Sequence, residues 1–200
     1  MLIYGAGGHA SVLLSLLCEN HIPVQCIFDD LVAGGNIEGI PIVHYQPAVF
    51  PDEKILIAIG DNQTRRLVAG KVLHSFACLV HPDAYIDKCS ELSLGSVVML
   101  GAIVQACSRI GKHVIINTGS IVEHHCVIHD YAHVGPGVVL CGQASVGEGT
   151  LIGAGSVVCP NIFIGANCII GAGTVVTRNI PDHSVARGNP ARIIKASCTR

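Results

Sequence analysis

The residues best suited to take part in a chemical reaction are histidines near the middle of the chain. Five of the eleven histidines lie between positions 112 and 134, where Glu123 is followed directly by His124 and His125. An imidazole has an unperturbed pKa of about 6.5, so near neutral pH it can accept a proton from an attacking amine or hydroxyl group. These histidines are therefore candidates for general-base catalysis.

The elements that must position these histidines are predicted by a six-residue repeat. From Val80 to Val176, every sixth residue is Val, Ile or Leu, without one insertion, and the residue four places later is nearly always small or β-branched. Neither a helix, with a period of 3.6, nor an isolated strand, with a period of 2, produces this spacing. Three short strands joined by tight corners close a coil of 18 residues, and coils stack about 4.8 Å apart through parallel ladder hydrogen bonds. We predict a parallel β-helix over 77–178.

Stacking at 18-residue intervals predicts which residues meet at the corners. Gly142 is expected directly over His124, and Gln143 over His125, with neither histidine on an inward position. The glycine would leave space beside the His124 imidazole. Another corner carries a column of small residues, which indicates either tight turns alone or a smooth groove for a long, thin ligand. This column contains Gly101, Gly119, Gly137, Gly155 and Gly173, with Gly135, Gly153, Gly171, Ala154 and Ala172 beside it.

The first 76 residues have a different pattern. Strands are predicted over 1–4, 24–28 and 54–59, and helices over 11–19 and 63–72. The turn after the first strand reads G-A-G-G-H-A, and the acidic pair Asp29-Asp30 ends the second strand. Glycines there let a phosphate approach the backbone and the helix N-terminus, and the acid suits a ribose hydroxyl or a base edge. We predict an α/β half-Rossmann domain (βαβαβ) that binds one nucleotide. The alternative is a turn that only allows close strand–helix packing, with His9 as a solvated cap residue.

Composition and charge exclude several other classes of protein. Half of the 200 residues are hydrophobic and 13% are charged, which excludes a disordered polymer. A net charge of −2 leaves no broad footprint for nucleic acid. No apolar run reaches the roughly 18 residues of a membrane helix, and the ten cysteines include no C-x-x-C pair. We expect a cytoplasmic protein without a signal peptide, membrane insertion or a nucleic-acid partner.

The hexapeptide repeat resembles that of the left-handed parallel β-helix acyltransferases. With the turn Gly5-Ala-Gly-Gly-His9, the pair Asp29-Asp30 and the run Ala58-Ile-Gly-Asp-Asn62, the whole chain looks like the sugar O-/N-acyltransferases of the NeuD/PglD type. The resemblance implies a homotrimer with three active sites between subunits and acetyl-CoA in the groove between neighbouring helices. It also implies that the following residues line the sugar-nucleotide side of the site: Gly7, Gly8, His9, Asp29, Asp30, Gly60, Asn62 and Arg65.

On the catalytic side, the resemblance places the general base at His124. The next residue is usually Asp or Glu in the family, whereas here it is His125, so Glu123 or Asp130 would have to supply a carboxylate. The histidine matching His133 lies near the thioester, where it or a backbone N–H stabilises the oxyanion. The alternative for His125, as for His113 and His129, is a solvated corner residue.

The implied acetyl-CoA side includes the end of the chain. After Val176 the repeat fails, and 179–200 is predicted to cap the open end of the β-helix. The run G-N-P-A-R at 188–192 resembles the family's ending, where basic residues approach the phosphates of CoA; Arg187, Arg192 and Lys195 are the candidates. The cofactor-binding residues that we expect are His133, Gly142, Ala154, Ala172, Arg187 and Arg192.

The favoured function is therefore an acetyl-CoA-dependent acetyltransferase that N-acetylates a nucleotide-linked amino sugar, with His124 as base, direct attack on the thioester and no metal. Acetylation of a hydroxyl group of sialic acid or a related sugar is the first alternative. A zinc enzyme like the gamma-class carbonic anhydrases is a distant one, because His124 and His129 have the H-x4-H spacing of that class. A non-catalytic protein that binds sugar nucleotides is another.

Overall fold

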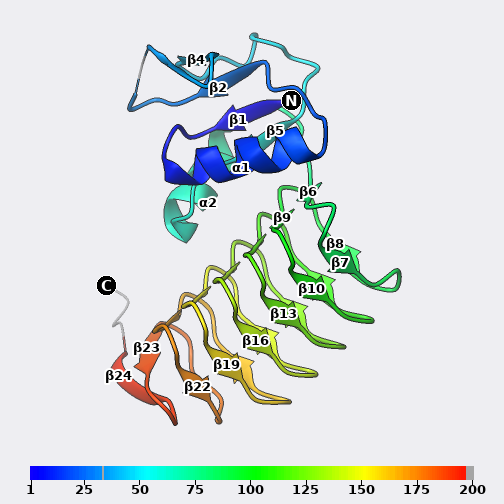
Figure 1. The fold of residues 1–200 in the computed structure, drawn as a ribbon. Helices are drawn as coiled ribbons and strands as arrows, with labels where there is room; N and C mark the ends of the chain where they lie inside the picture. Colours follow the sequence, from blue (N-terminus) through cyan, green and yellow to red (C-terminus); the bar gives the residue numbers. More distant parts are fainter. Residues whose placement is uncertain (33, 197–200) are drawn as a thin grey trace.

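The chain folds into an α/β domain seated on a long parallel β-helix (Figure 1). The computed structural model describes residues 1–32 and 34–196. The α/β domain lies at the end where the β-helix begins, and the C-terminal strands lie at the other end (Figure 1). Among the described residues, no helix is long and apolar enough to cross a membrane.

The α/β domain is built on one sheet of order β3-β4-β2-β1-β5, parallel except for the β3–β4 hairpin. Strands β1, β2 and β5 are completely buried apolar triplets, as their sequences predicted. The prediction missed β3 and β4, because the segment around them is rich in glycine and too short to show a period. The elements are β1 (Leu2–Tyr4), α1 (Gly8–Glu19), β2 (Cys26–Phe28), β3 (Asn36–Ile37), β4 (Ile40–Val43), β5 (Ile55–Ile57) and α2 (Asn62–Lys71).

The β-helix has three parallel sheets, one for each side of a triangular prism. The first, the open face, comprises β7 (Tyr85–Ile86), β10 (Ile103–Val104), β13 (Ile121–Val122), β16 (Val139–Leu140), β19 (Val157–Val158) and β22 (Val175–Val176). The second, the polar face, comprises β8 (Glu91–Leu92), β11 (Arg109–Ile110), β14 (Val127–Ile128), β17 (Ser145–Val146) and β20 (Phe163–Ile164). The third, the domain face, comprises β6 (Leu79–Val80), β9 (Val97–Val98), β12 (Ile115–Ile116), β15 (His133–Val134), β18 (Leu151–Ile152), β21 (Ile169–Ile170), β23 (Ser184–Arg187) and β24 (Arg192–Ala196).

Both rules of the six-residue repeat are explained by the interior of the prism. The aliphatic positions form its continuous core. The small positions lie at the inside of the corners, where hydroxyl groups satisfy the backbone. The Ser108 hydroxyl donates to the Glu123 carbonyl (2.8 Å) and accepts the Cys126 N–H from the next coil (3.1 Å). The hydroxyls of Ser90, Ser96, Thr150 and Ser156 join two coils in the same way, whereas those of Ser120 and Thr174 donate to a carbonyl three residues back in their own coil.

The three corner types differ in the residue that takes the left-handed backbone conformation. The His124 corner, residues 123–126 and their stacked equivalents, joins the open face to the polar face. Its left-handed position holds Cys107, His125, Gln143 and Asn161 on successive coils, with φ between 58° and 64°. The helix corner, 129–132 and equivalents, leads to the domain face. The glycine corner, 135–138 and equivalents, returns to the open face and has glycine at this position, as predicted.

The two domains are joined by the first half of the domain face. The outward side chains of Leu79, Val97 and Ile115 are almost completely buried in one cluster with Leu13 and Leu17 of α1. The same outward column continues, at 18-residue steps, through a histidine, Leu151 and Ile169, which the α1 cluster does not include. The apolar contact between α1 and the domain face therefore ends after Ile115, and position 133 lies at its border.

The segment after β22 extends the domain face. Strand β23 pairs in parallel with β21, and β24 folds back antiparallel on β23. These strands lie beside the last coils of the domain face, and the capping role expected of 179–200 stays a prediction.

Candidate active site

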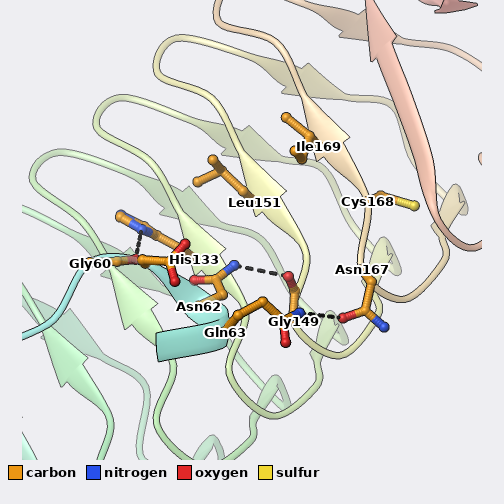
Figure 2. A pocket seen from close by; sticks show the side chains of 10 residues that line it. Gly60, Asn62, Gln63, His133, Gly149, Leu151, Asn167, Cys168 and Ile169 are labelled. Atoms are coloured by element: carbon orange, nitrogen blue, oxygen red, sulfur yellow. Dashed lines mark hydrogen bonds between the residues drawn. The ribbon is translucent and has the colours of Figure 1, made fainter. Parts of the chain in front are cut away.

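A cavity of about 400 Å³ lies where the N-terminus of α2 meets the domain face (Figure 2). Asn62 Nδ2 donates to the Gly149 carbonyl (3.0 Å), and Gln63 Nε2 donates to Asn167 Oδ1 (2.9 Å), so α2 is held against two successive helix corners. The other walls are Gly60, Asp61, His133, Leu151, Cys168 and Ile169.

His133 is fixed at one end of this cavity by a hydrogen bond at each ring nitrogen. Nδ1 lies 3.3 Å from the Gly60 carbonyl, which can only accept, so Nδ1 carries the proton (Figure 2). Nε2 then accepts from Asn117 Nδ2 (3.0 Å). Burial, with the positive charge of Arg65, lowers the pKa of His133 to about 4. His133 is therefore a neutral imidazole whose orientation and tautomer are set by its neighbours.

Asn117 was not singled out by the sequence, although it is part of this site. It follows β12 at the glycine corner, and its Oδ1 accepts the Thr118 N–H (2.8 Å) while Nδ2 reaches His133. In the sequence, Asn117 is marked only as a polar residue that follows a run of aliphatic ones. Other corners of the repeat have the same feature, so it does not identify a site residue.

The glycine turn opens toward solvent at the start of α1. A Cβ added at Gly7 or Gly8 would meet nothing within 4 Å, so the first turn of the helix is accessible to a ligand. Helix N-termini with free N–H groups favour phosphate. His9 follows, with its Nε2 buried and no hydrogen-bond partner among the described residues. Burial, aided by Arg65, lowers the pKa of His9 to about 4.

Asp29 and Asp30 end β2, as predicted, but both carboxylates are engaged within the domain. Asp29 Oδ2 accepts the Ala6 N–H (2.8 Å), which ties the glycine turn to β2, and Oδ1 accepts the Leu31 N–H (2.8 Å). Asp30 Oδ2 accepts the Tyr4 hydroxyl (2.7 Å) and pairs with Lys71. The hydrogen bonds from Lys71 and then Tyr4 lower the pKa of Asp30 to about 2.

A second cavity, of about 280 Å³, lies above this acidic pair. Two leucines on its rim are unusually open to solvent, with 95% of Leu31 and 74% of Leu67 exposed. The polar floor contains Asp30 and Lys71. Apolar rims over a polar floor suit a planar group that is hydrogen-bonded along its edge.

Arg65 differs from the expectation that it lines the sugar-nucleotide side of the site. The residue is 1% exposed, and its five N–H groups all have protein acceptors. Asn62 Oδ1 is one of them, and carbonyls supply the others: His113, Ile59, Gly60 and Tyr131. Burial lowers the pKa of Arg65 to about 10. In this structure the guanidinium joins the α/β domain to the helix corner, and no N–H is left for a ligand.

His124 lies at a corner, as predicted, with its ring stacked under Gly142. A Cβ at Gly142 would lie 2.6 Å from His124 Cε1 and 2.7 Å from Nε2, so only glycine leaves room for the imidazole. On the other side of the ring, Nδ1 lies 3.1 Å from His125 Nδ1. Among the described residues, no hydrogen bond or ion pair joins His124 to Glu123 or any other carboxylate. Asp130 instead accepts the Lys112 N–H at the helix corner (2.8 Å).

The structure does not bring His124 and His133 together within one chain. His133 is on the domain face, which is bounded by the helix corner and the glycine corner. The His124 corner joins the other two faces, so it is the edge of the prism opposite the domain face. His129 is at yet another corner, and the described residues contain no group of three His, Cys, Asp or Glu side chains able to hold a metal ion.

The residues predicted to bind acetyl-CoA are spread along the C-terminal coils. Ala154 and Ala172 are exposed on the glycine corner, which runs along one edge of the domain face. Arg187 and Arg192 are exposed on the cap, and a Cβ added at Gly171 would lie 3.1 Å from the Arg187 Cβ. The side chain of Lys195 lies outside the described residues.

Comparisons with known proteins match both domains. The family model described as the PglD N-terminal domain matches residues 1–72, and the bacterial transferase hexapeptide model matches 107–142 and 143–178. UDP-N-acetylbacillosamine N-acetyltransferase of Bacillus subtilis (strain 168) is 41% identical over 107 residues, which is 48% of this chain. The match spans only half the length of that curated relative.

Solved structures match over nearly the whole chain. PerB from Caulobacter crescentus, solved with CoA and GDP-perosamine, is 36% identical, with a TM-score of 0.92, over 97% of this chain and 96% of its own. The acetyltransferase domain of PglB from Neisseria gonorrhoeae FA1090, solved with acetyl coenzyme A, is 31% identical, with a TM-score of 0.90, over 96% and 98%.

The neutral histidines at the domain junction predict how stability depends on pH. His9, His113 and His133 each have a pKa of about 4 in the fold, against about 6.5 when unfolded. The unfolded chain therefore binds more protons between these values, and the stability present above about pH 6.5 is lost as the pH falls toward 4. We expect the thermal midpoint, followed by circular dichroism, to fall between about pH 7 and about pH 5. His113→Phe should weaken this dependence, whereas exposed His129→Gln should not; a constant midpoint would contradict the assignment.

The hydrogen bonds of Arg65 predict a large cost for a substitution that keeps the charge. In Arg65→Lys, one ammonium group cannot reach five separated acceptors, and buried carbonyls lose their donors. We expect a loss of about 3 kcal/mol or more in the free energy of unfolding, measured by urea denaturation. Arg66→Lys is the matched control, because Arg66 is half exposed in a surface ion pair with Glu148 and should cost under about 1 kcal/mol. Equal stability of the two variants would show that the Arg65 contacts are dispensable.

Proposed function

Because the chain belongs to the hexapeptide-repeat sugar acyltransferases of the NeuD/PglD type, we propose that it transfers the acetyl group of acetyl-CoA to the amino group of a nucleotide-linked amino sugar. The observation that carries this proposal is the continuity of the α/β domain's open surfaces with the cavity at His133. The names of the relatives, which are N-acetyltransferases, favour an amine over a hydroxyl group as the acceptor.

The sugar nucleotide has a continuous path along the N-termini of the two helices. Its base fits the cavity between Leu31 and Leu67, above Asp30. Its diphosphate then lies at the start of α1, where Gly7 and Gly8 leave the backbone open. Gly60 lines the cavity at His133 and the preceding residue lines the cavity above Asp30, so the two cavities are neighbours. The sugar would therefore reach the domain face near His133 and Asn117.

The base and the acceptor sugar must come from different copies of the chain. Within one chain, His124 is on the edge opposite the domain face, so it cannot reach a sugar held near His133. The open face next to His124 is also apolar on its outer side and has no covering element among the described residues; its outward residues are Tyr85, Ile103, Ile121, Val139, Val157 and Val175. We propose a homotrimer in which this face packs against a neighbouring copy and His124 completes that copy's site.

Acetyl-CoA is the co-substrate, and the residues present suit it. The glycine corner presents only small residues at Ala154 and Ala172, so an extended pantetheine arm can lie against the backbone. Arg187 and Arg192 are exposed at the end of that corner, where cations would pair with phosphates. From the phosphates, the pantetheine arm would run along the glycine corner toward the coil that holds His133.

The chemistry that we propose is direct transfer. His124 Nε2 takes a proton from the sugar amine as the amine nitrogen attacks the thioester carbonyl; the C–S bond then breaks, and the CoA sulfur receives that proton. The backbone N–H of Gly142 has no partner among the described residues and lies beside the His124 ring, so it is our candidate donor to the oxyanion. His133 has no proton at Nε2 and acts by holding Asn117.

Replacing His124 tests the base. We expect His124→Asn to lower kcat by roughly 10²- to 10⁴-fold with KM for acetyl-CoA nearly unchanged. The assay follows thiol release from acetyl-CoA with GDP-, UDP- and dTDP-linked amino sugars. His129→Gln, an exposed histidine at the next corner, is the control and should keep full activity. Normal kcat in His124→Asn, or thiol release with no amino sugar in the panel, would overturn the proposal.

Mixing inactive variants tests the shared site. His124→Asn and Asn117→Ala damage opposite surfaces, so in mixed trimers some sites receive an intact His124 from one subunit and an intact Asn117 from another. We expect the two inactive proteins, denatured together and refolded, to recover roughly a quarter or less of wild-type activity. Proteins refolded separately and then mixed serve as the control. No recovery in the co-refolded sample would indicate that the site is built within one chain.

A further inference from the structure

The base has an unusual neighbour in this chain. His124 Nδ1 and His125 Nδ1 are 3.1 Å apart, and the two rings meet edge to face, at 82° with centroids 5.3 Å apart. At this distance one nitrogen must donate a proton and the other must accept it. The contact therefore leaves two arrangements, in which the shared proton belongs to Nδ1 of His124 or to Nδ1 of His125.

The backbone holds His125 in position for this contact. Its φ of +58° is the left-handed conformation of the corner, and its N–H donates to the Ala106 carbonyl of the preceding coil (2.9 Å). The same conformation recurs one coil later at Gln143, whose N–H donates to the His124 carbonyl (2.9 Å). The direction of the His125 Cα–Cβ bond is therefore set by the coil, independently of any ligand.

The two nitrogens of the His124 ring have different surroundings. Nε2 and Cε1 pack against Gly142, where an added Cβ would collide with the ring, and Nε2 has no hydrogen-bond partner among the described residues. Nδ1 is occupied by His125. A base that works through Nε2 needs its lone pair there, and a neutral imidazole with a bare Nε2 carries its proton on Nδ1.

We propose that His125 is a positioning residue that, as a neutral imidazole, accepts the Nδ1–H of His124 and so keeps the Nε2 lone pair available as the base. This inference rests on the proposed role of His124. It assigns to a second histidine the task that an acidic residue performs elsewhere: orienting the base and fixing its tautomer. His125 touches no substrate in this arrangement.

The surroundings of the pair contain little charge to compete with this contact. Among the described residues 122–127, Glu123 has the one acidic side chain, and the same corner carries Asp87 and Lys88 two coils earlier. The coil before contributes Cys107, and the coil after contributes Gly142 and Gln143. No carboxylate of the described residues bonds to either ring, so an imidazolium formed at His124 would face a neutral partner.

This arrangement has a consequence for pH dependence. A carboxylate in place of His125 would favour the charged imidazole. As the pH is lowered, a His125→Asp variant should therefore lose activity at a higher pH than the wild type does.

Three variants at this position separate positioning from structure. His125→Asn offers an amide oxygen to Nδ1–H, and Asn tolerates φ > 0, so kcat should stay within about 5-fold of wild type. His125→Ala has no acceptor, so kcat should fall roughly 10- to 100-fold with KM for both substrates within about twofold. In His125→Asp, the acidic limb of kcat against pH should move up by about one pH unit. Gln143→Ala, at the same corner position with φ +64°, is the control for backbone strain and should be nearly fully active.

Imidazole ¹⁵N NMR provides a readout that does not depend on turnover. At neutral pH the wild type should show His124 with a protonated Nδ1 and a bare Nε2, and His125→Ala should show a mixture of tautomers. A His124 ring protonated at Nε2 in the wild type, or a His125→Ala variant with wild-type kcat and an unchanged pH profile, would overturn the proposal. If instead His124→Asn is fully active, the proposed function itself fails, whatever the tautomer.

Discussion

The positions of all corner residues in the β-helix depend on the 18-residue register of its coils. Each coil bonds to the next through the backbone of all three faces, and hydroxyls such as that of Ser108 bond to two coils at once. A residue added or lost in one coil would shift every corner that follows it. The register puts Gly142 over His124 and sets the left-handed backbone at His125. The geometry of the proposed base, His124, is therefore a property of the repeat.

The second constraint is a buried positive charge at the domain junction. Among the described residues, Arg65 forms no ion pair with a carboxylate, and its N–H groups are satisfied by carbonyls and one amide. A second charge nearby would be costly, and burial together with Arg65 keeps His9 and His133 neutral. His133 is therefore suited to hold Asn117 rather than to take up a proton, which is consistent with the proposed base at the exposed corner.

These two constraints divide the proposed site between surfaces. The open turn of the α/β domain and the cavity at His133 lie along the domain face, and the glycine corner borders that face. His124 lies on the opposite edge of the same prism. The aliphatic core of the prism lies between His124 and the domain face. Because this core is closely packed, a side chain cannot reach through it. The proposed assembly of several copies would resolve this separation, and it would also account for the apolar outer side of the open face.

The sequence by itself determined the coil, the corners and the main elements of the α/β domain. Their signals are local: a period of six, glycines at fixed steps, and apolar triplets next to turn residues. It also placed Gly142 over His124, because a strict repeat turns a separation along the chain into a distance in space.

Only the tertiary structure decided which groups are partners. Arg65 reaches Tyr131, 66 residues away, and Gln63 reaches Asn167, 104 residues away, because of the height at which α2 docks on the coil. Asn117 and the contact between the two corner histidines became visible for the same reason. Periodicity encodes the register of a repeat with itself, but it contains no information about where a second, non-repeating domain will pack or how a side chain will turn. Those are set by the sum of many weak contacts across the interface, which no local pattern records.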